Sequence, residues 1–281
     1  MSLANTLDTT GWQVPSYDSF IFNERRHRYA LVVPVINEGD RIRAQLQHTA
    51  AASLPVDVII ADGGSTDGSL DQEFLTQVGV RALLVKSGPG WLSAQLRMAY
   101  SWCLIEGYEG VITIDGNGKD NVEAVANFAD KLNQACDYIQ GSRYLSGGKS
   151  ENTPLERTIG NRLFHAPLLS IVGRHWFTDT TNGFRAYSAR YLLDPNVAPF
   201  RDEFQKYELL FYLTARAGQL GYRVCHLPVS RVYPPNRDVP TKISGFAPKL
   251  SLLVQLGKVI LGLYIPSRIK RKMLNQDRAG E

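Results

Sequence analysis

The sequence predicts an α/β fold in which helices flank a mostly parallel β-sheet. Three observations lead to this expectation: short apolar runs alternate with longer amphipathic segments, the runs are rich in β-branched residues, and most of them end in a polar turn. Continuous apolar runs are typical of strands buried on both faces, and alternation of strands with helices is typical of βαβ units. A chain of 281 residues can hold one large domain of this class or two small ones.

The expected elements begin at Tyr29 and alternate as far as Ser142. Apolar, β-branched runs predict strands over 29–36, 56–62, 81–87, 110–115 and 136–142. Helical spacing of apolar residues predicts helices over 38–53, 91–107 and 121–135, with a short helix between the second and third strands. After Gly148 we expect, in order, a helical segment over 153–173, a polar and turn-rich segment over 177–192, a helix over 202–221 and a strand over 222–233.

These patterns divide the chain into three parts. Residues 1–28 are polar and mixed, and we expect them to be a leader that packs on the main domain. Residues 29–238 form the main domain, whose second half has the size of an extension and not of a separate domain. Residues 239–281 form a basic, amphipathic and helical tail.

The composition excludes several classes of protein. An apolar content of 44% and a charged content of 21% are those of an ordinary globular chain, and a net charge of +4 does not by itself indicate a nucleic-acid partner, which we do not expect. The chain has three cysteines, far apart, which fits a reducing compartment and predicts neither a disulfide framework nor a zinc site. We find no signal peptide and no stretch of about 18 apolar residues, so we expect no transmembrane helix.

Polar residues follow four of the predicted strands. These strand ends are Asn37-Glu38, Asp62-Gly63-Gly64-Ser65-Thr66-Asp67, Asp115-Gly116-Asn117 and Gly141-Ser142-Arg143. In open parallel sheets, ligands bind outside the carboxyl ends of the strands. We therefore expect the four loops to form one crevice, although each of them alone is equally typical of a turn or a helix cap.

The stretch "VITIDGNGKD", residues 111–120, carries the most chemistry. Asp115 offers a carboxylate and Asn117 a neutral carbonyl, the oxygen ligands that Mg²⁺ and Mn²⁺ prefer. Lys119 cannot bind a metal while it is protonated, but it can bind a phosphate. The stretch could hold a metal and a phosphate, could hold a phosphate without a metal, or could be only a strand that ends in a turn.

Several strings together carry a family resemblance. They are "VVPVINE", "VIIADGGSTDGS", "TIDGNGKD", "YIQGSRY", "DTTNGFRAYS" and "LGYRVCHLPV", in that order, over roughly residues 30–230. The chain resembles glycosyltransferase family 2, and within it the dolichyl- or polyprenyl-phosphate sugar transferases. The resemblance implies the GT-A fold, with a Rossmann-like, nucleotide-binding sheet, a nucleotide-sugar donor, inversion at the anomeric carbon and usually Mg²⁺ or Mn²⁺. It also implies a role in the synthesis of cell-envelope polysaccharides.

The resemblance also implies roles for individual residues. The donor-binding positions that match the family are Pro34, Ile36, Glu38, Asp62, Gly64, Asp115, Gly116 and Asn117. The family's metal motif falls on Asp115 and Asn117. The catalytic positions are Asp115, Lys119, Arg143 and Arg185, and those for an acceptor phosphate are Arg157, Arg237 and Lys242.

Three departures from the family pattern affect this assignment. Gly63 replaces the second Asp of the family's Asp-Asp-Gly-Ser, Asn117 replaces the second metal carboxylate, and Lys119 stands where a Gln often helps to hold the metal. Losing a negative charge and gaining a positive one weakens the binding of a divalent cation. One hypothesis is that Lys119 takes over part of the metal's role, and the rival is that Asp115 and Asn117 still bind a metal through the donor phosphates.

The acceptor is expected to be a lipid phosphate. The second half of the chain offers many cations for a phosphate nucleophile, namely Arg143, Arg157, Arg162, Arg185, Arg231, Arg237 and Lys242. A hydroxyl acceptor would need a general base instead, for which Asp179, Asp202 and Glu203 are candidates. A glycan or other hydroxyl acceptor is therefore the alternative, and a non-catalytic subunit that binds nucleotide-sugars is an alternative of a different class.

The tail predicts where the protein acts. Residues 239–276 contain seven Lys or Arg residues and no Asp or Glu, interleaved with the apolar stretch "LSLLVQLGKVILGLYI". A basic amphipathic segment is typical of a helix that lies in a membrane interface, although a core helix with a solvated basic end has the same pattern. We expect a cytoplasmic protein bound peripherally to the inner face of a membrane.

Overall fold

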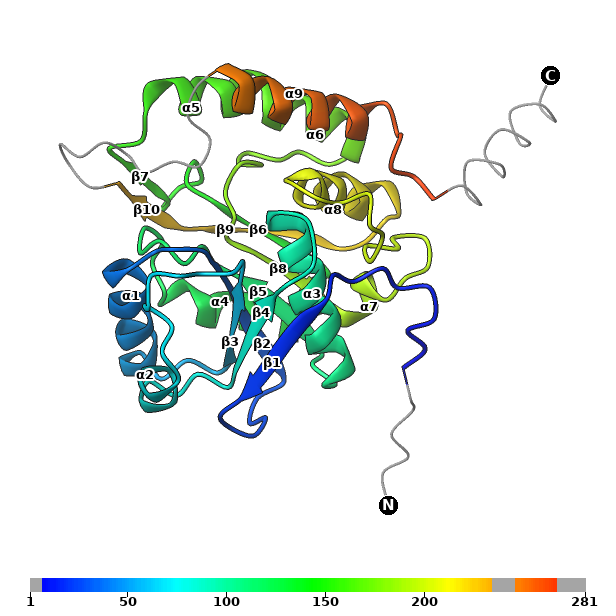
Figure 1. The fold of residues 1–281 in the computed structure, drawn as a ribbon. Helices are drawn as coiled ribbons and strands as arrows, with labels where there is room; N and C mark the ends of the chain where they lie inside the picture. Colours follow the sequence, from blue (N-terminus) through cyan, green and yellow to red (C-terminus); the bar gives the residue numbers. More distant parts are fainter. Residues whose placement is uncertain (1–6, 234–245, 267–281) are drawn as a thin grey trace, which may run out of the picture.

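The computed structural model describes residues 7–233 and 246–266, and its centre is an eight-stranded sheet in the order β1-β4-β3-β2-β5-β8-β6-β9 (Figure 1). The strands of this sheet are β1 (Tyr17–Ile21), β2 (Tyr29–Val35), β3 (Asp57–Asp62), β4 (Ala82–Lys86), β5 (Gly110–Thr113), β6 (Tyr138–Ser142), β8 (Arg185–Ser188) and β9 (Val224–Pro228). Strands β4, β3, β2 and β5 are parallel neighbours, and so are β6 and β9. The predicted α/β fold with its large sheet is confirmed.

Helices cover both faces of the sheet, as the unbroken apolar runs predicted. They are α1 (Asp40–Ala51), α2 (Gln72–Gln77), α3 (Leu92–Ile105), α4 (Ala124–Asn133), α5 (Leu155–Gly160), α6 (Ala166–Gly173), α7 (Ala189–Leu192), α8 (Glu208–Gln219) and α9 (Phe246–Ile260), and a π-helical turn, η1 (Asn161–His165), joins α5 to α6. Neighbouring residues of β2 show the two layers. Val32 packs in the core beneath α3 and α8, whereas Leu31 and Val33 pack in the core beneath α1 and α4.

Two strands of the eight-stranded sheet lie where the sequence predicted none. Residues 177–192 were expected to be turn-rich, but Arg185–Ser188 forms β8, which is antiparallel to both β5 and β6 and lies between them. Its four residues, "RAYS", include no β-branched side chain. Pairing with β5 and β6 therefore determines this strand more than the strand propensity of its own residues does. In the leader, Tyr17–Ile21 forms β1, an edge strand antiparallel to β4.

The prediction that the cysteines form no disulfide is wrong. Cys136 and Cys225 are bonded, with their Cα atoms 6.0 Å apart and a sequence separation of 89, while Cys103 is free and buried. The bond is possible because β6 and β9 are parallel neighbours, with Ile139 opposite Cys225 in the register. Sequence spacing does not reveal this adjacency.

The helix expected in the tail is α9, which lies along α6 at one end of the molecule (Figure 1). One side of α9 packs on the core through Leu256 and Val259. Its other side leaves Leu250, Leu253 and Val254 about half exposed. Among the helices that the structure describes, none is long and apolar enough to cross a membrane.

Candidate active site

A cavity of about 1000 Å³ opens at the carboxyl ends of the parallel strands. Its wall includes residues from all four of the strand ends that the sequence singled out, including Glu38, Gly63, Asp115 and Arg143. Ligand pockets span about 300–1000 Å³, so this one is large enough for a nucleotide-sugar together with part of an acceptor. The prediction that four separate loops meet in one crevice is confirmed.

The loops are held together by side chains that bond to neighbouring backbone. Asn37 donates its N–H to Ser65 Oγ at 3.0 Å, and its own Oδ1 accepts from the Thr66 N–H at 2.8 Å. Gln45 of α1 does the same for the loop after β5, since its Nε2 donates to the Asp115 carbonyl at 3.0 Å and its Oε1 accepts from the Gly118 N–H at 2.7 Å. Gln45 was not singled out from the sequence, although it is a polar residue on the buried face of an amphipathic helix.

Most of the predicted site residues line the cavity. They are Pro34, Ile36, Glu38, Asp115, Gly116, Asn117, Lys119, Arg143, Arg157 and Arg185. Asp62 and Gly64 are not among the lining residues. Asp62 closes its own turn, accepting from the Ser65 N–H at 2.9 Å and from Ser65 Oγ at 2.6 Å. Arg237 and Lys242 lie outside the described residues.

Two of the predicted catalytic arginines have partners that fix them in the structure. Arg143 forms a buried ion pair with Asp179, with Nε–Oδ2 at 2.7 Å and Nη2–Oδ1 at 2.9 Å. Arg185 is fully buried and donates to the carbonyls of Thr180, Asn182 and Leu210, so most of its guanidinium holds backbone in place. Both side chains still reach the cavity wall.

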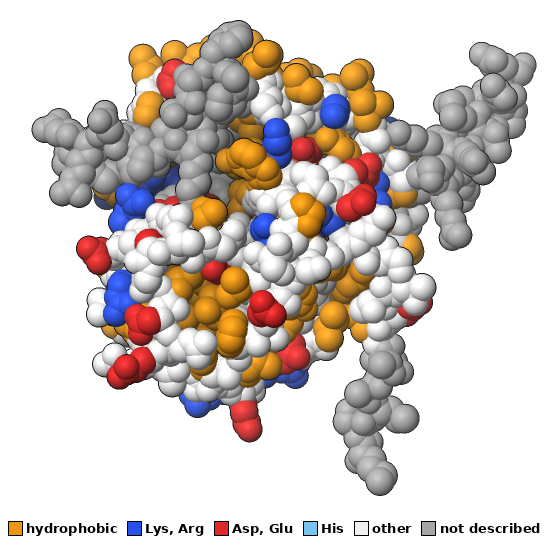
Figure 2. Space-filling model, in the orientation of Figure 1, with side chains coloured by type: hydrophobic (Ala, Val, Ile, Leu, Met, Phe, Trp, Pro, Cys, Tyr) orange, Lys and Arg blue, Asp and Glu red, His pale blue; other side chains and the backbone are white. Residues whose placement is uncertain are grey.

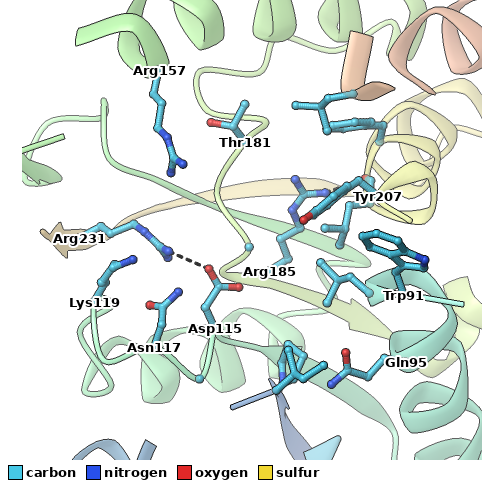
Figure 3. A pocket seen from close by; sticks show the side chains of 18 of the residues that line it. Trp91, Gln95, Asp115, Asn117, Lys119, Arg157, Thr181, Arg185, Tyr207 and Arg231 are labelled. Atoms are coloured by element: carbon cyan, nitrogen blue, oxygen red, sulfur yellow. Dashed lines mark hydrogen bonds and ion pairs between the residues drawn. The ribbon is translucent and has the colours of Figure 1, made fainter. Parts of the chain in front are cut away.

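The centre of the site is a guanidinium between two carboxylates. Figure 3 shows one of these ion pairs, between Arg231 and Asp115. Arg231 of β10 (Ser230–Val232) donates from Nη2 to Asp115 Oδ2 at 2.8 Å and from Nη1 to Asp120 Oδ2 at 2.5 Å. Strand β10 pairs with β7 (Lys149–Glu151) and also bridges to Asp120. The sequence named Arg231 only as one of several basic residues and gave no signal for its contact with Asp115.

Burial and the charge of Arg231 shift the pKa values of three residues in the site. Burial alone would raise the pKa of Asp115, but the charge of Arg231 outweighs it and the pKa lies below its usual value. Asp120 lies deeper, and burial raises its pKa despite Arg231. Burial, and then the charge of Arg231, lower the pKa of Lys119.

These residues do not fit a divalent cation. The carboxylate of Asp115 is already paired with Arg231, the second position of the motif is the neutral Asn117, and the Lys119 ammonium lines the same cavity. Within 7–233 and 246–266, no group of three or more His, Cys, Asp or Glu residues could hold a metal ion. Sites for Mg²⁺ and Mn²⁺ are built from anionic and neutral oxygens and not beside cations.

The chain is similar to known sugar transferases. No protein-family model matches it. It is 25% identical over 208 residues to polyprenol monophosphomannose synthase from Mycolicibacterium smegmatis, which covers 72% of this chain and 77% of the relative. It is 26% identical over 211 residues to undecaprenyl-phosphate mannosyltransferase from Micrococcus luteus, which covers 73% of this chain and 84% of the relative.

Solved structures agree on the fold. The glucosyl-3-phosphoglycerate synthase of Mycobacterium tuberculosis in complex with UDP superposes with a TM-score of 0.59 at 16% identity, covering 85% of this chain and 81% of that one. The fold is that of the GT-A glycosyltransferases. A second structure of that synthase, with Mn²⁺, UDP and glucosyl-3-phosphoglycerate, has a TM-score of 0.56 at 17% identity. The GT-A fold and the resemblance to polyprenyl-phosphate sugar transferases, both expected from the sequence, are thus confirmed.

Proposed function

We propose that the protein is an inverting glycosyltransferase that moves a sugar from a nucleotide-sugar donor to a polyprenyl or dolichyl phosphate at a membrane surface. The names of its relatives support this substrate class. The observation that carries the proposal is the composition of the cavity. Among the described residues that line it, the basic side chains are Lys86, Lys119, Arg143, Arg157, Arg185 and Arg231, and the acidic ones are Glu38, Asp115 and Glu156.

The reaction needs positive charge at two places. An oxygen of the acceptor phosphate forms a bond to the anomeric carbon, and the bond from that carbon to the donor diphosphate breaks with its electron pair leaving on the diphosphate. Both the nucleophile and the leaving group are anions, so no proton has to be removed. Fixed cations stabilise the charge that develops on the leaving group. We assign Lys119 to the donor diphosphate and Arg157, whose guanidinium points into the cavity, to the acceptor phosphate (Figure 3).

The alternative, a hydroxyl acceptor, lacks a general base among the sequence candidates. Asp179 is fully buried and its carboxylate is held by Arg143. Asp202 and Glu203 are not lining residues of the cavity, and Glu203 is paired with Arg201. A base must lie within hydrogen-bond reach of the proton that it removes. These positions therefore favour an acceptor that is already ionised.

The apolar surface beside the cavity suits a lipid acceptor. Along α5, η1 and α6, large apolar side chains are exposed at Leu155, Ile159, Leu163, Phe164, Leu168 and Ile171. The half-exposed Leu253 of α9 lines the cavity itself, as do Glu156 and Arg157 of α5. Figure 2 has apolar side chains along the edge of the molecule formed by these helices. Exposed apolar patches of this kind mark membrane or protein contacts. We assign this patch as the surface that contacts the inner face of a membrane.

A transfer assay tests the proposal. The full chain is incubated with labelled nucleotide-sugars and with undecaprenyl phosphate, undecaprenol or a water-soluble glycan, and the products are partitioned between organic and aqueous phases. We expect organic-phase label with undecaprenyl phosphate only, and its loss in an Asp115→Ala variant. Label transferred to undecaprenol or to the glycan argues for a hydroxyl acceptor. Equal background rates in both proteins would indicate a binding subunit without catalysis.

A further inference from the structure

We infer that Arg231 is the resident cation of the donor site, and that it binds the donor diphosphate beside Asp115 and Asn117, the positions on which the family resemblance places a metal motif. This inference rests on the proposed function and names how the same site holds its donor. It rests on three features of the structure: the anchoring of the guanidinium, the backbone bonds of the strand that carries it, and the charge around it.

The guanidinium is anchored as a metal would be, between carboxylates from separate positions of the chain. Asp115 Oδ2 lies 2.8 Å from Nη2 and Asp120 Oδ2 lies 2.5 Å from Nη1. The side chain of Asp120 is fully buried. Two carboxylates on one guanidinium hold its plane and its charge in a fixed place, and it remains protonated at every working pH.

The backbone fixes the position of Arg231 as well. The Val232 N–H donates to the Lys119 carbonyl at 2.9 Å, and the Asn121 N–H donates to the Ser230 carbonyl at 3.2 Å. Asn121 Oδ1 also accepts from the Ser230 N–H at 2.9 Å. The strand that carries Arg231 is thus bonded directly to the loop that carries Lys119 and Asp120. These hydrogen bonds fix the positions of Arg231 and Lys119 relative to each other.

Both cations line the cavity, Arg231 with its two carboxylate partners in place. Lys119 Nζ lies 4.9 Å from the centre of the Tyr233 ring and has no hydrogen-bond or ion-pair partner within the part of the chain that the structure describes. The two carboxylates, Asp115 and Asp120, can balance two positive charges, that of Arg231 and one more. The cavity wall offers two more cations, Lys119 and Arg157. A divalent cation entering here would be repelled by neighbours that attract a diphosphate.

The chemistry follows without a metal. As the bond between the anomeric carbon and the leaving oxygen breaks, the electron pair moves to the diphosphate. Arg231 and Lys119 then face the added negative charge, which N–H donors from a guanidinium and an ammonium stabilise by charge-assisted hydrogen bonds. No proton transfer and no additional reactant is needed.

Calorimetry on the full-length protein tests the inference. UDP and GDP are titrated into wild type in EDTA and again in excess Mn²⁺. We expect the dissociation constant of the nucleotide that binds to be the same in both conditions within about threefold. Binding that requires Mn²⁺, by about tenfold or more, overturns the inference and leaves the proposed function intact. Absence of binding by either nucleotide in both conditions overturns the proposed function, and the inference with it.

Variants give a second, independent readout. Arg231→Met removes the charge and frees Asp115 and Asp120, so we expect it to weaken binding in EDTA by about 100-fold and to recover part of that loss when Mn²⁺ is added. Arg231→Lys should keep binding in EDTA within about tenfold of wild type. Arg28→Met, which breaks an exposed ion pair with Glu109, is the matched control and should leave binding unchanged. If Arg231→Met folds, as judged by its thermal transition, and binds as wild type does in EDTA, the inference is wrong. If it does not fold, the wild-type comparison decides alone.

Discussion

Gly183 lies directly against the carboxylate of Asp115. A β-carbon built on residue 183 would come 2.5 Å from Asp115 Oδ1, closer than real contacts allow. The residue precedes Phe184 and β8, a strand that the sequence did not predict. Glycine at this position therefore lets the strand beside β5 pass close to the carboxylate that pairs with Arg231.

Gly183→Ala is expected to push Asp115 out of its ion pair and to lower kcat/KM by about 10- to 100-fold, because small displacements of reacting groups are costly. Initial rates with a water-soluble short-chain acceptor phosphate measure this. Gly257→Ala in α9 is the control, since a β-carbon there meets nothing within 4 Å. Equal rates for Gly183→Ala and wild type would mean that the position of Asp115 does not matter for transfer.

Asp179→Asn is expected to reduce the free energy of unfolding by about 3–5 kcal/mol, because it leaves the Arg143 guanidinium buried without a counter-charge. Urea denaturation measures the change. Glu109→Gln breaks an ion pair in which both side chains are more than half exposed, and should cost no more than about 1 kcal/mol. An Asp179→Asn variant of full stability that has lost transfer would identify Asp179 as a general base and favour a hydroxyl acceptor.

The affinity for the donor should fall at high pH because of Lys119. Burial and the charge of Arg231 lower the pKa of Lys119, so the ammonium loses its proton at a lower pH than an exposed lysine would. The neutral amine no longer attracts a diphosphate, and donor affinity is therefore present below this pKa and lost as the pH rises through it. Lys119→Arg should remove the decline, because arginine stays protonated, and Lys119→Met should lower kcat/KM by about 100-fold even at neutral pH. A pH profile of the donor dissociation constant that is the same for wild type and Lys119→Arg would contradict this account.

Ile171→Glu is expected to weaken binding to anionic vesicles by about tenfold or more, because the side chain is 75% exposed on α6 and would lose its place in the acyl boundary. Co-sedimentation with vesicles measures the change. Ile105→Glu is the matched control: its side chain is 55% exposed at the end of α3, away from the carboxyl edge of the sheet. If both variants bind vesicles as wild type does, the surface over α5, α6 and α9 is not the membrane contact.

The sequence was sufficient for the parts of the site that follow from strand order. β2, β3 and β5 are parallel neighbours, so residues directly after them had to meet, and Glu38, Gly63 and Asp115 do line one cavity. The sequence was not sufficient for contacts that depend on the conformation of a loop or turn. Asp62 follows the same rule of strand ends, yet its carboxylate closes a local turn with Ser65.

Long-range pairs were out of reach for a different reason. Arg231 lies 116 residues after Asp115, and the two meet only because the three-residue strand β10 runs beside the loop after β5. Cys136 and Cys225 likewise meet because β6 and β9 are neighbours beyond the inserted strand β8. The strands β8 and β10 have four and three residues, too few to show a recognisable sequence pattern. The partners of Asp115 and Cys136 could therefore not be assigned from the sequence.

Strand β9 is fastened at both of its ends. At its beginning the Cys225 sulfur is covalently joined to Cys136, and three residues after its last residue, Pro228, the guanidinium of Arg231 is clamped by Asp115 and Asp120. A long basic side chain usually loses rotamer freedom when it captures an anion, and that loss opposes binding. Here the ordering has been completed during folding, so an arriving diphosphate meets a rigid cation and its association is opposed by little further entropy.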